Sequence, residues 1–232
     1  MIAVVAGASG LVGRELVREL LASESCERVY ALVRSPLAAT PTHPKLTQIQ
    51  ADFTRLAEPP APIAGAHLFC ALGTTIKKAG SQDAFRAVDQ GAVLAYASWG
   101  REHGAERFLA VSSLGADPSS SVFYSRVKGE TERDLAKLSF SSLVFFRPSL
   151  LLGRSSERRP GEIFAAALMK PAGRLLRGPL AKYRPIEASV VARAMVRVSK
   201  GALERPVVRI IESDEIAALG RTGGPRGHQA VS

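Results

Sequence analysis

Residues 2–13, IAVVAGASGLVG, decide the fold of this chain. The apolar run 2–6 predicts a buried strand, and a helical pattern follows directly after the glycines. Gly7, Gly10 and Gly13 are spaced G-x-x-G-x-x-G between the two elements. A glycine-rich corner of this kind directs backbone N–H groups and the positive end of the helix dipole to one point, where a pyrophosphate fits. The alternative is a tight turn without a ligand, but the context favours nucleotide binding.

Length and composition predict one soluble globular domain. The chain has 232 residues, of which 46% are hydrophobic and 22% are charged, enough to bury a substantial core. No apolar run approaches the ~20 residues that cross a bilayer, and the chain begins with its first predicted strand, without the features of a signal peptide. Cys26 and Cys70 form no disulfide framework, which favours a reducing cytoplasm. The four histidines lack metal-ligand spacing, so we expect no metal.

The positive charge is concentrated in the C-terminal part of the chain. Residues 1–146 carry 15 basic and 14 acidic side chains, whereas residues 147–232 carry 16 basic and 7 acidic ones. This excess is either a solvated surface or a site that attracts a phosphate or carboxylate group. The basic residues form no dense run and have few aromatic neighbours, so we expect no nucleic-acid partner.

Short apolar runs alternate with helical patterns along the chain, which predicts an α/β fold with a doubly wound parallel sheet and helices on both faces. The predicted strands are 2–6, 28–33, 46–51, 67–72, 107–112, 143–147 and 206–211. The predicted helices are 11–22, 82–103, 122–138, 161–177 and 187–201. We expect one domain, with a cofactor part over 1–146, a small substrate-binding part over 147–219 and a flexible tail over 220–232.

Ligands of such a sheet bind beyond the carboxyl ends of the strands, and the residue after the second strand distinguishes the two nicotinamide cofactors. Sites for NAD usually have an Asp or Glu there to bind the ribose 2′-hydroxyl, but this strand ends at Arg34. A guanidinium binds a 2′-phosphate, which favours NADP(H) over NAD(H) unless Arg34 is only a surface residue. Arg14 is a candidate for a second phosphate contact. Asp52, after the third strand, is placed to bind the adenine amino group or to cap a turn.

Tyr124 and Lys128 are four residues apart on a predicted helix, so their side chains share one face. A tyrosine with a pKa near ~10 exchanges protons poorly at neutral pH until a nearby cation stabilises its phenolate, and an ammonium group does this. The pair follows the end of the fifth strand, where a serine hydroxyl can polarise a substrate carbonyl. We choose Ser113 for this role, with Ser112 as the alternative.

Taken together and in this order, these motifs resemble the short-chain dehydrogenase/reductase superfamily. More narrowly, the chain resembles the atypical branch typified by the HIV Tat-interactive oxidoreductase family. The matching stretches are CALGTT at 70–75, SSLGAD at 112–117, YSRVKGE at 124–130, FRP at 146–148 and RPGE at 159–162. The resemblance extends over nearly the whole chain apart from the tail, and it implies a Rossmann-like fold that binds NADP(H).

The resemblance also implies roles for individual residues. Tyr124 would be the acid/base and Lys128 its partner, while Leu151 and Arg159 would close over the cofactor. The chain contains no asparagine, so the Asn that anchors a proton-relay water in many members is absent, and Asp89 stands where many extended members have Asn. The residues expected to contact the cofactor are Gly7, Ser9, Gly10, Leu11, Val12, Gly13, Arg14, Arg34, Asp52, Ala71, Leu72, Gly73, Asp89, Tyr124, Lys128, Pro148, Leu151 and Arg159.

Three functions are compatible with these residues. The first is an NADPH-dependent reductase of a carbonyl or activated double bond, whose small substrate is anionic if the C-terminal positive charge serves it. The second is a regulator that senses NADP(H) without turnover, although such a protein would not need an activated phenol. The third is a sugar-nucleotide epimerase or dehydratase, which usually needs a larger C-terminal lobe than this chain has. By analogy with similar proteins, helices 82–103 and 122–138 could form a homodimer contact.

Overall fold

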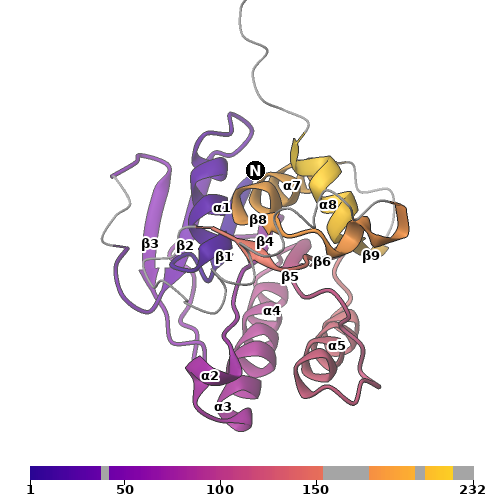
Figure 1. Ribbon diagram of the computed structural model, residues 1–232. Coiled ribbons are helices and arrows are strands. Elements are labelled where there is room, and N and C mark those ends of the chain that lie inside the picture. Colours follow the sequence, from indigo (N-terminus) through magenta and orange to yellow (C-terminus); the bar gives the residue numbers. More distant parts are fainter. Residues whose placement is uncertain (38–41, 154–177, 202–206, 222–232) are drawn as a thin grey trace, which may run out of the picture.

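The computed structural model describes residues 1–37, 42–153, 178–201 and 207–221. Within them, seven parallel strands form one sheet in the order β3-β2-β1-β4-β5-β6-β9 (Figure 1). The strands of this sheet are β1 Ile2–Ala6, β2 Arg28–Val33, β3 Leu46–Gln50, β4 His67–Cys70, β5 Arg107–Val111, β6 Ser142–Arg147 and β9 Val207–Glu212. Two further short strands, β7 Leu151–Leu152 and β8 Ile186–Glu187, pair with each other. The prediction of a doubly wound parallel sheet is confirmed.

All seven strands of the sheet were predicted within about two residues of their bounds, because the strands of a parallel sheet are covered on both faces and read as continuous apolar runs. In β1, the residues from Ala3 to Ala6 are all buried. The strand order reverses between β1 and β4. Ligands of open α/β sheets bind at such a switch point, beyond the carboxyl ends of the strands.

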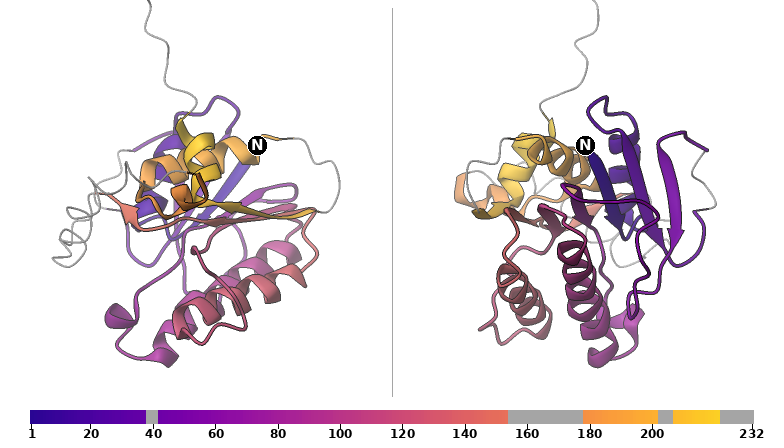
Figure 2. Two further views of the ribbon diagram at one scale, coloured as in Figure 1. Left: turned by 45° about the vertical axis from the view of Figure 1, so that its right-hand side comes forward. Right: turned by 180° about the vertical axis from the view of Figure 1, so that it is seen from behind.

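Helices cover both faces of the sheet (Figure 2). Helices α1 Leu11–Leu21, α7 Ala188–Ser199 and α8 Ser213–Arg221 pack on one face, and α4 Val93–Glu102 and α5 Phe123–Ala136 pack on the other. Each face has its own buried cluster: Leu16, Met195 and Ile216 belong to the first, and Tyr96 and Phe108 to the second.

The long helix predicted over 82–103 is helical throughout but not uniform. It consists of α3 Gln82–Arg86, a wider π-helical turn η1 Ala87–Ala92, and α4. Such turns frequently occur at functional sites. The sequence also did not predict α8, the short α2 Ile76–Ala79 and the 3₁₀ turn η2 Gly178–Tyr183. The helix predicted over 161–177 lies outside the described residues. The homodimer contact through helices 82–103 and 122–138 stays a prediction.

The flexible tail was predicted to begin too early. Gly220 and Arg221 belong to α8, and a Cβ atom added to Gly220 would lie 2.6 Å from Cγ1 of Val190 on α7. Gly220 is therefore a close-packing residue between two helices, whereas its neighbours in sequence made it look like part of a loop. Residues 222–232 lie outside the described part of the chain.

Candidate functional site

The glycine corner after β1 has the geometry that the sequence predicted. Gly7 has φ +81°, and a Cβ atom on it would lie 2.5 Å from the backbone of Ala71, which follows β4. A Cβ atom on Gly13 would lie 2.7 Å from the carbonyl carbon of Gly7. Gly10 precedes α1 and caps it with no side-chain hydrogen bond, and the first turn of α1 contains no acidic residue. The corner therefore presents backbone N–H groups in a positive field that suits an anion.

The residues predicted to lie beyond the other strand ends differ in what they contact. Arg34 after β2 and Arg14 in α1 are both exposed. The carboxylate of Asp52 accepts hydrogen bonds from the backbone N–H of Thr54 at 2.9 Å and from its hydroxyl at 2.8 Å. These two bonds lower the pKa of Asp52. Asp52 thus caps a turn through one of its oxygens, and its contact with the adenine amino group stays a prediction.

Tyr124 and Lys128 share one face of α5 in different surroundings. The ring of Tyr124 packs at 5.5 Å on that of Phe85, a fully buried residue of α3. Lys128 is buried, and its Nζ lies 2.7 Å from Oδ1 of Asp89, whose side chain is 1% exposed. The other oxygen of Asp89 accepts a hydrogen bond of 2.8 Å from the backbone N–H of Thr74. The lysine is thus held in place by an ion pair inside the protein.

The π-helical turn η1 sets the position of this carboxylate. The hydroxyl of Thr131 donates its shorter hydrogen bond, of 2.7 Å, to the carbonyl of Val127 within α5, and it lies 3.2 Å from the backbone carbonyl of Asp89. The turn is therefore in contact with the helix that carries Lys128. A Cβ atom on Gly73 would lie 3.4 Å from Oδ1 of Asp89 and 3.7 Å from Nζ of Lys128. The loop after β4 therefore passes close over the ion pair. Gly7 packs against Ala71 of the same loop, so the glycine corner and the ion pair of Asp89 and Lys128 both contact the segment 71–73.

Burial and charge act in opposite directions on the pKa of Lys128. Burial alone would lower it, because a charged amine loses its hydration. The negative charge of Asp89, together with that of the ionised form of Tyr124, outweighs this effect and raises the pKa of Lys128 above its ordinary value. The ammonium form is the one present at neutral pH.

The two candidate serines after β5 are distinguished by their partners. Ser112 donates a hydrogen bond of 2.5 Å to Glu132, a buried carboxylate one turn beyond Lys128. Glu132 also accepts hydrogen bonds from Arg147 at 3.0 Å and 2.5 Å. The hydroxyl of Ser113 donates only a long local bond of 3.3 Å to the carbonyl of Leu114. This difference favours Ser113 as the residue that meets a substrate, and it gives Ser112 a structural role.

Sequence reasoning missed Glu132. The available signal was its spacing, since Glu132 follows Lys128 by four residues and so continues the stripe that begins at Tyr124. A cavity of about 10 Å³, room for no more than one water, lies between the two ion pairs and is bordered by Asp89, Ser112, Lys128 and Glu132. This cavity lies between α5 and the sheet, because Ala110 of β5 and Phe145 of β6 also line it.

The pair of Glu132 and Arg147 leads to a stability prediction. We expect Arg147→Met to lower the free energy of unfolding by about 3–5 kcal/mol, because it leaves the buried Glu132 carboxylate without its counter-ion. The double variant Glu132→Leu with Arg147→Met should be much closer to wild type. The measurement is urea unfolding of both variants.

The matched control removes an exposed arginine of the same kind. Arg209 pairs with Glu215 on the surface, where both side chains are nearly half exposed, so Arg209→Met should cost less than about 1 kcal/mol. If Arg147→Met and Arg209→Met lowered the free energy of unfolding equally, the buried pair would contribute no more to stability than the exposed pair does.

Other predicted site residues fall at the margin of the described part. Pro148 follows β6, and Leu151 begins β7, whereas Arg159 lies outside the described residues. Among the described residues, no group of three or more His, Cys, Asp or Glu side chains could hold a metal ion. None of the described helices has both the length and the hydropathy that a membrane span requires.

Comparison with known proteins identifies the family of this chain. A model of the NAD(P)H-binding family matches residues 7–140. Protein HTATIP2 of Rattus norvegicus is 35% identical over 227 residues, which cover 96% of this chain and 90% of that protein. The chain belongs to the NAD(P)H-binding family. Within this family it is an atypical short-chain dehydrogenase/reductase, as its motifs predicted.

Solved structures with the same fold are more distant in sequence. MoeE5 in complex with UDP-glucose and NAD has a TM-score of 0.66 at 17% identity, and the match covers 95% of this chain and 81% of that one. The human epimerase family protein SDR39U1 with NADPH has a TM-score of 0.55 at 17% identity, with the same coverage. These likenesses confirm the Rossmann-like fold that NAD(P)H-binding proteins share.

A further relative corrects the predicted location. Protein FMP52, mitochondrial, of Coccidioides immitis is 32% identical over 236 residues, which cover 94% of this chain and 96% of that protein. Its name contradicts the expectation of a cytoplasmic protein. The reasoning failed because two cysteines without a disulfide framework indicate only a reducing environment, and that property does not select one compartment.

Proposed function

We propose that this protein is an NADP(H)-dependent oxidoreductase that reduces a carbonyl or an activated double bond of a small substrate. The observation that carries the proposal is the pair of Tyr124 and Lys128, because a tyrosine one helical turn from a buried ammonium is equipped to transfer a proton. The glycine corner lies against the same loop that passes over Lys128. Cofactor and proton donor would thus meet at one edge of the sheet.

The residues present fit a dinucleotide. A Cβ atom at Gly7 or Gly13 would collide with the backbone, so the corner stays tight, and the start of α1 leaves N–H groups for a pyrophosphate. When bound, the cofactor supplies the hydride. Tyr124 would give its proton to the oxygen that becomes negative, and Ser113 would donate a hydrogen bond to the same oxygen. The ammonium of Lys128 would stabilise the phenolate that remains.

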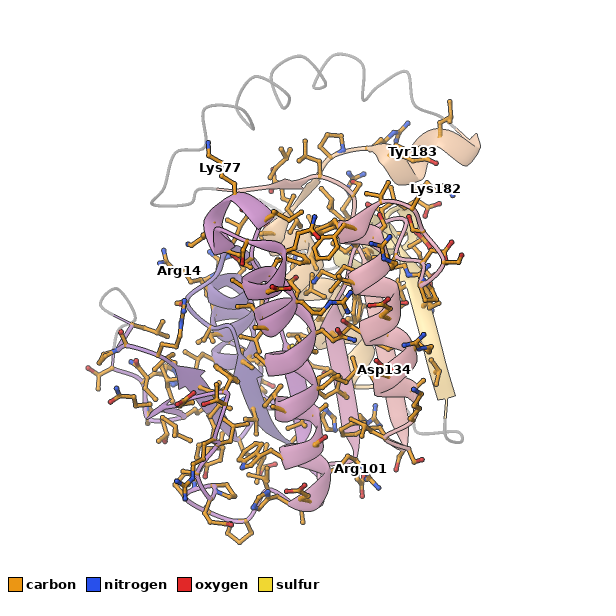
Figure 3. All side chains as sticks on the ribbon, turned by 90° about the horizontal axis from the view of Figure 1, so that it is seen from below. Arg14, Lys77, Arg101, Asp134, Lys182 and Tyr183 are labelled. Atoms are coloured by element: carbon orange, nitrogen blue, oxygen red, sulfur yellow. The ribbon has the colours of Figure 1, made fainter. Side chains whose placement is uncertain are left out.

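The charge of the surface supports an anionic substrate. Figure 3 shows Lys77, Lys182 and Tyr183 at one end of the molecule, with Arg101 in the last turn of α4 at the other. Cations near the strand ends would attract a carboxylate or phosphate group.

A pure NADP(H) sensor would gain nothing from the buried ammonium beside Tyr124. The likeness to MoeE5 in complex with UDP-glucose, and to an epimerase family protein, is one of fold alone, so it does not favour an epimerase.

Thermal unfolding with each cofactor tests the proposal. Excess NADPH should raise the melting temperature, since a ligand at 100 times its Kd stabilises the folded state by about 2.7 kcal/mol, and NADH should raise it less. Arg34→Glu should reverse this preference, because a carboxylate repels a 2′-phosphate and accepts hydrogen bonds from a ribose hydroxyl.

The control places the same charge change at the other end of β2. Arg28 is exposed and is the first residue of β2, so Arg28→Glu should keep the preference for NADPH. An unchanged melting temperature with either cofactor would contradict the proposed function. An unchanged preference in Arg34→Glu would contradict only the role of Arg34.

A further inference from the structure

Lys128 is a buried amine whose charge needs compensation. A lysine side chain without a partner in a protein interior commonly loses its proton, with a pKa that can fall to about 5–6. The proposed function requires the charged form, because only an ammonium stabilises a phenolate. The groups that face Lys128 therefore decide whether the site can work at neutral pH.

These groups come from several elements, and they contribute unequally. Tyr124 and Glu132 lie one turn before and one turn after Lys128 on α5, Cys70 ends β4, and Asp89 comes from η1. Burial raises the pKa of the Cys70 thiol to about 12, so it is neutral. Glu132 is bound by both Arg147 and Ser112.

Asp89 is the remaining carboxylate, and it is within 2.7 Å of the ammonium. Its side chain is almost completely buried, and among the described residues Lys128 is the cation with which it forms an ion pair. Its second oxygen is fixed by the backbone of Thr74, which keeps the carboxylate aimed at Lys128.

We infer that Asp89 is a positioning residue that keeps Lys128 charged and aligned beneath the loop 73–74. The wider turn of η1 serves this contact, because it carries Asp89 to the side of α5 that bears Lys128. The consequence for proton transfer by Tyr124 rests on the proposed function, whereas the effect of Asp89 on the charge of Lys128 does not. The charge can therefore be tested without a substrate.

The test is the pH dependence of stability in Asp89→Asn. Asparagine can still accept the hydrogen bond from Thr74, but it carries no charge. Without Asp89, the pKa of Lys128 in the folded state should fall below that of the unfolded state, so the unfolded chain binds the extra proton. The stability of the variant should then rise with pH between pH 6 and pH 9, by up to about tenfold in the unfolding equilibrium constant per pH unit. In wild type the pKa of Lys128 is raised in the folded state, so the contribution of Lys128 to stability is constant between pH 6 and pH 9. This contribution is lost only when the pH rises above the ordinary lysine value.

Two further variants separate charge from packing. Gln90 is the neighbour of Asp89 in η1, and Gln90→Ala removes its hydrogen bonds to Arg86 and Asp134 without changing the ion pair of Lys128. The stability of this variant should therefore change with pH as that of wild type does. Lys128→Met leaves Asp89 buried alone, which raises the pKa of the carboxyl group in the folded state, so stability should fall as pH rises above the ordinary aspartate value. This second slope keeps the inference testable if Asp89→Asn does not fold.

The outcomes are distinct from those of the cofactor experiment. Opposite slopes in Asp89→Asn and Lys128→Met, measured by urea unfolding without ligand, would establish mutual charge compensation. Profiles parallel to wild type in the variants that fold would overturn the inference. Binding of NADPH to wild type, measured separately, decides the proposed function and leaves this result unaffected.

Discussion

Tyr124→Phe is expected to lower turnover by at least about 10²-fold while leaving the binding of NADPH intact. The substitution removes one hydroxyl from a ring that packs against Phe85, so the packing of α5 should not change. Loss of a positioned acid/base typically lowers the rate by about 10²–10⁴-fold. The measurements are the rise in melting temperature with NADPH and the rate of NADPH oxidation with a carbonyl compound that wild type reduces.

Tyr30→Phe is the matched control. Tyr30 is a buried residue of β2, packed in the cluster beneath α4. The same loss of a hydroxyl there should leave both binding and turnover close to wild type. If Tyr124→Phe reduced the same compound at the wild-type rate, Tyr124 would have no role as the proton donor.

Gly13→Ala should both weaken NADPH binding and destabilise the fold. The new methyl group would lie 2.7 Å from the carbonyl carbon of Gly7, so α1 would have to move away from β1. Overpacking of this kind costs about 1–3 kcal/mol or more, and the shift also moves the N–H groups that would bind the pyrophosphate. Urea unfolding and titration with NADPH measure the two effects.

The control introduces the same methyl group where space exists. A Cβ atom on Gly91, an exposed residue of η1, would lie 3.9 Å from the carbonyl oxygen of Arg86, which is an ordinary van der Waals contact. Gly91→Ala should therefore keep wild-type stability or gain slightly, since alanine favours helix. Equal behaviour of the two variants would mean that the tight approach between Gly13 and Gly7 is not needed.

The sheet and the glycine corner could be predicted because their signals are local. Buried parallel strands are continuous apolar runs, and the spacing of Gly7, Gly10 and Gly13 implies a close strand–helix approach. The turn chemistry of Asp52 was left open because the same residue type suits a ligand contact and a cap. The hydrogen bonds to Thr54 establish the cap, whereas the ligand contact stays a prediction.

The ion pairs could not be predicted because they join residues far apart in the sequence. Asp89 and Lys128 meet across two elements, and no periodicity within 82–103 indicates a wider turn at Asp89. Glu132 shares the stripe of Tyr124 and Lys128, but its binding to Ser112 and Arg147 depends on how β5 and β6 lie beside α5. That contact favours Ser113 over Ser112 as the residue that meets a substrate, and this choice stays a prediction.

The π-helical turn also limits how the chain can change in length. A π-helical turn closes i→i+5 hydrogen bonds where an α-helix closes i→i+4, so it holds one residue more. Deleting one residue between Ala87 and Ala92 would leave a regular helix in which α3 and α4 nearly keep their relative orientation, but it would remove the widened backbone that carries Asp89. Relatives that lack this extra residue would need a different partner for the buried lysine.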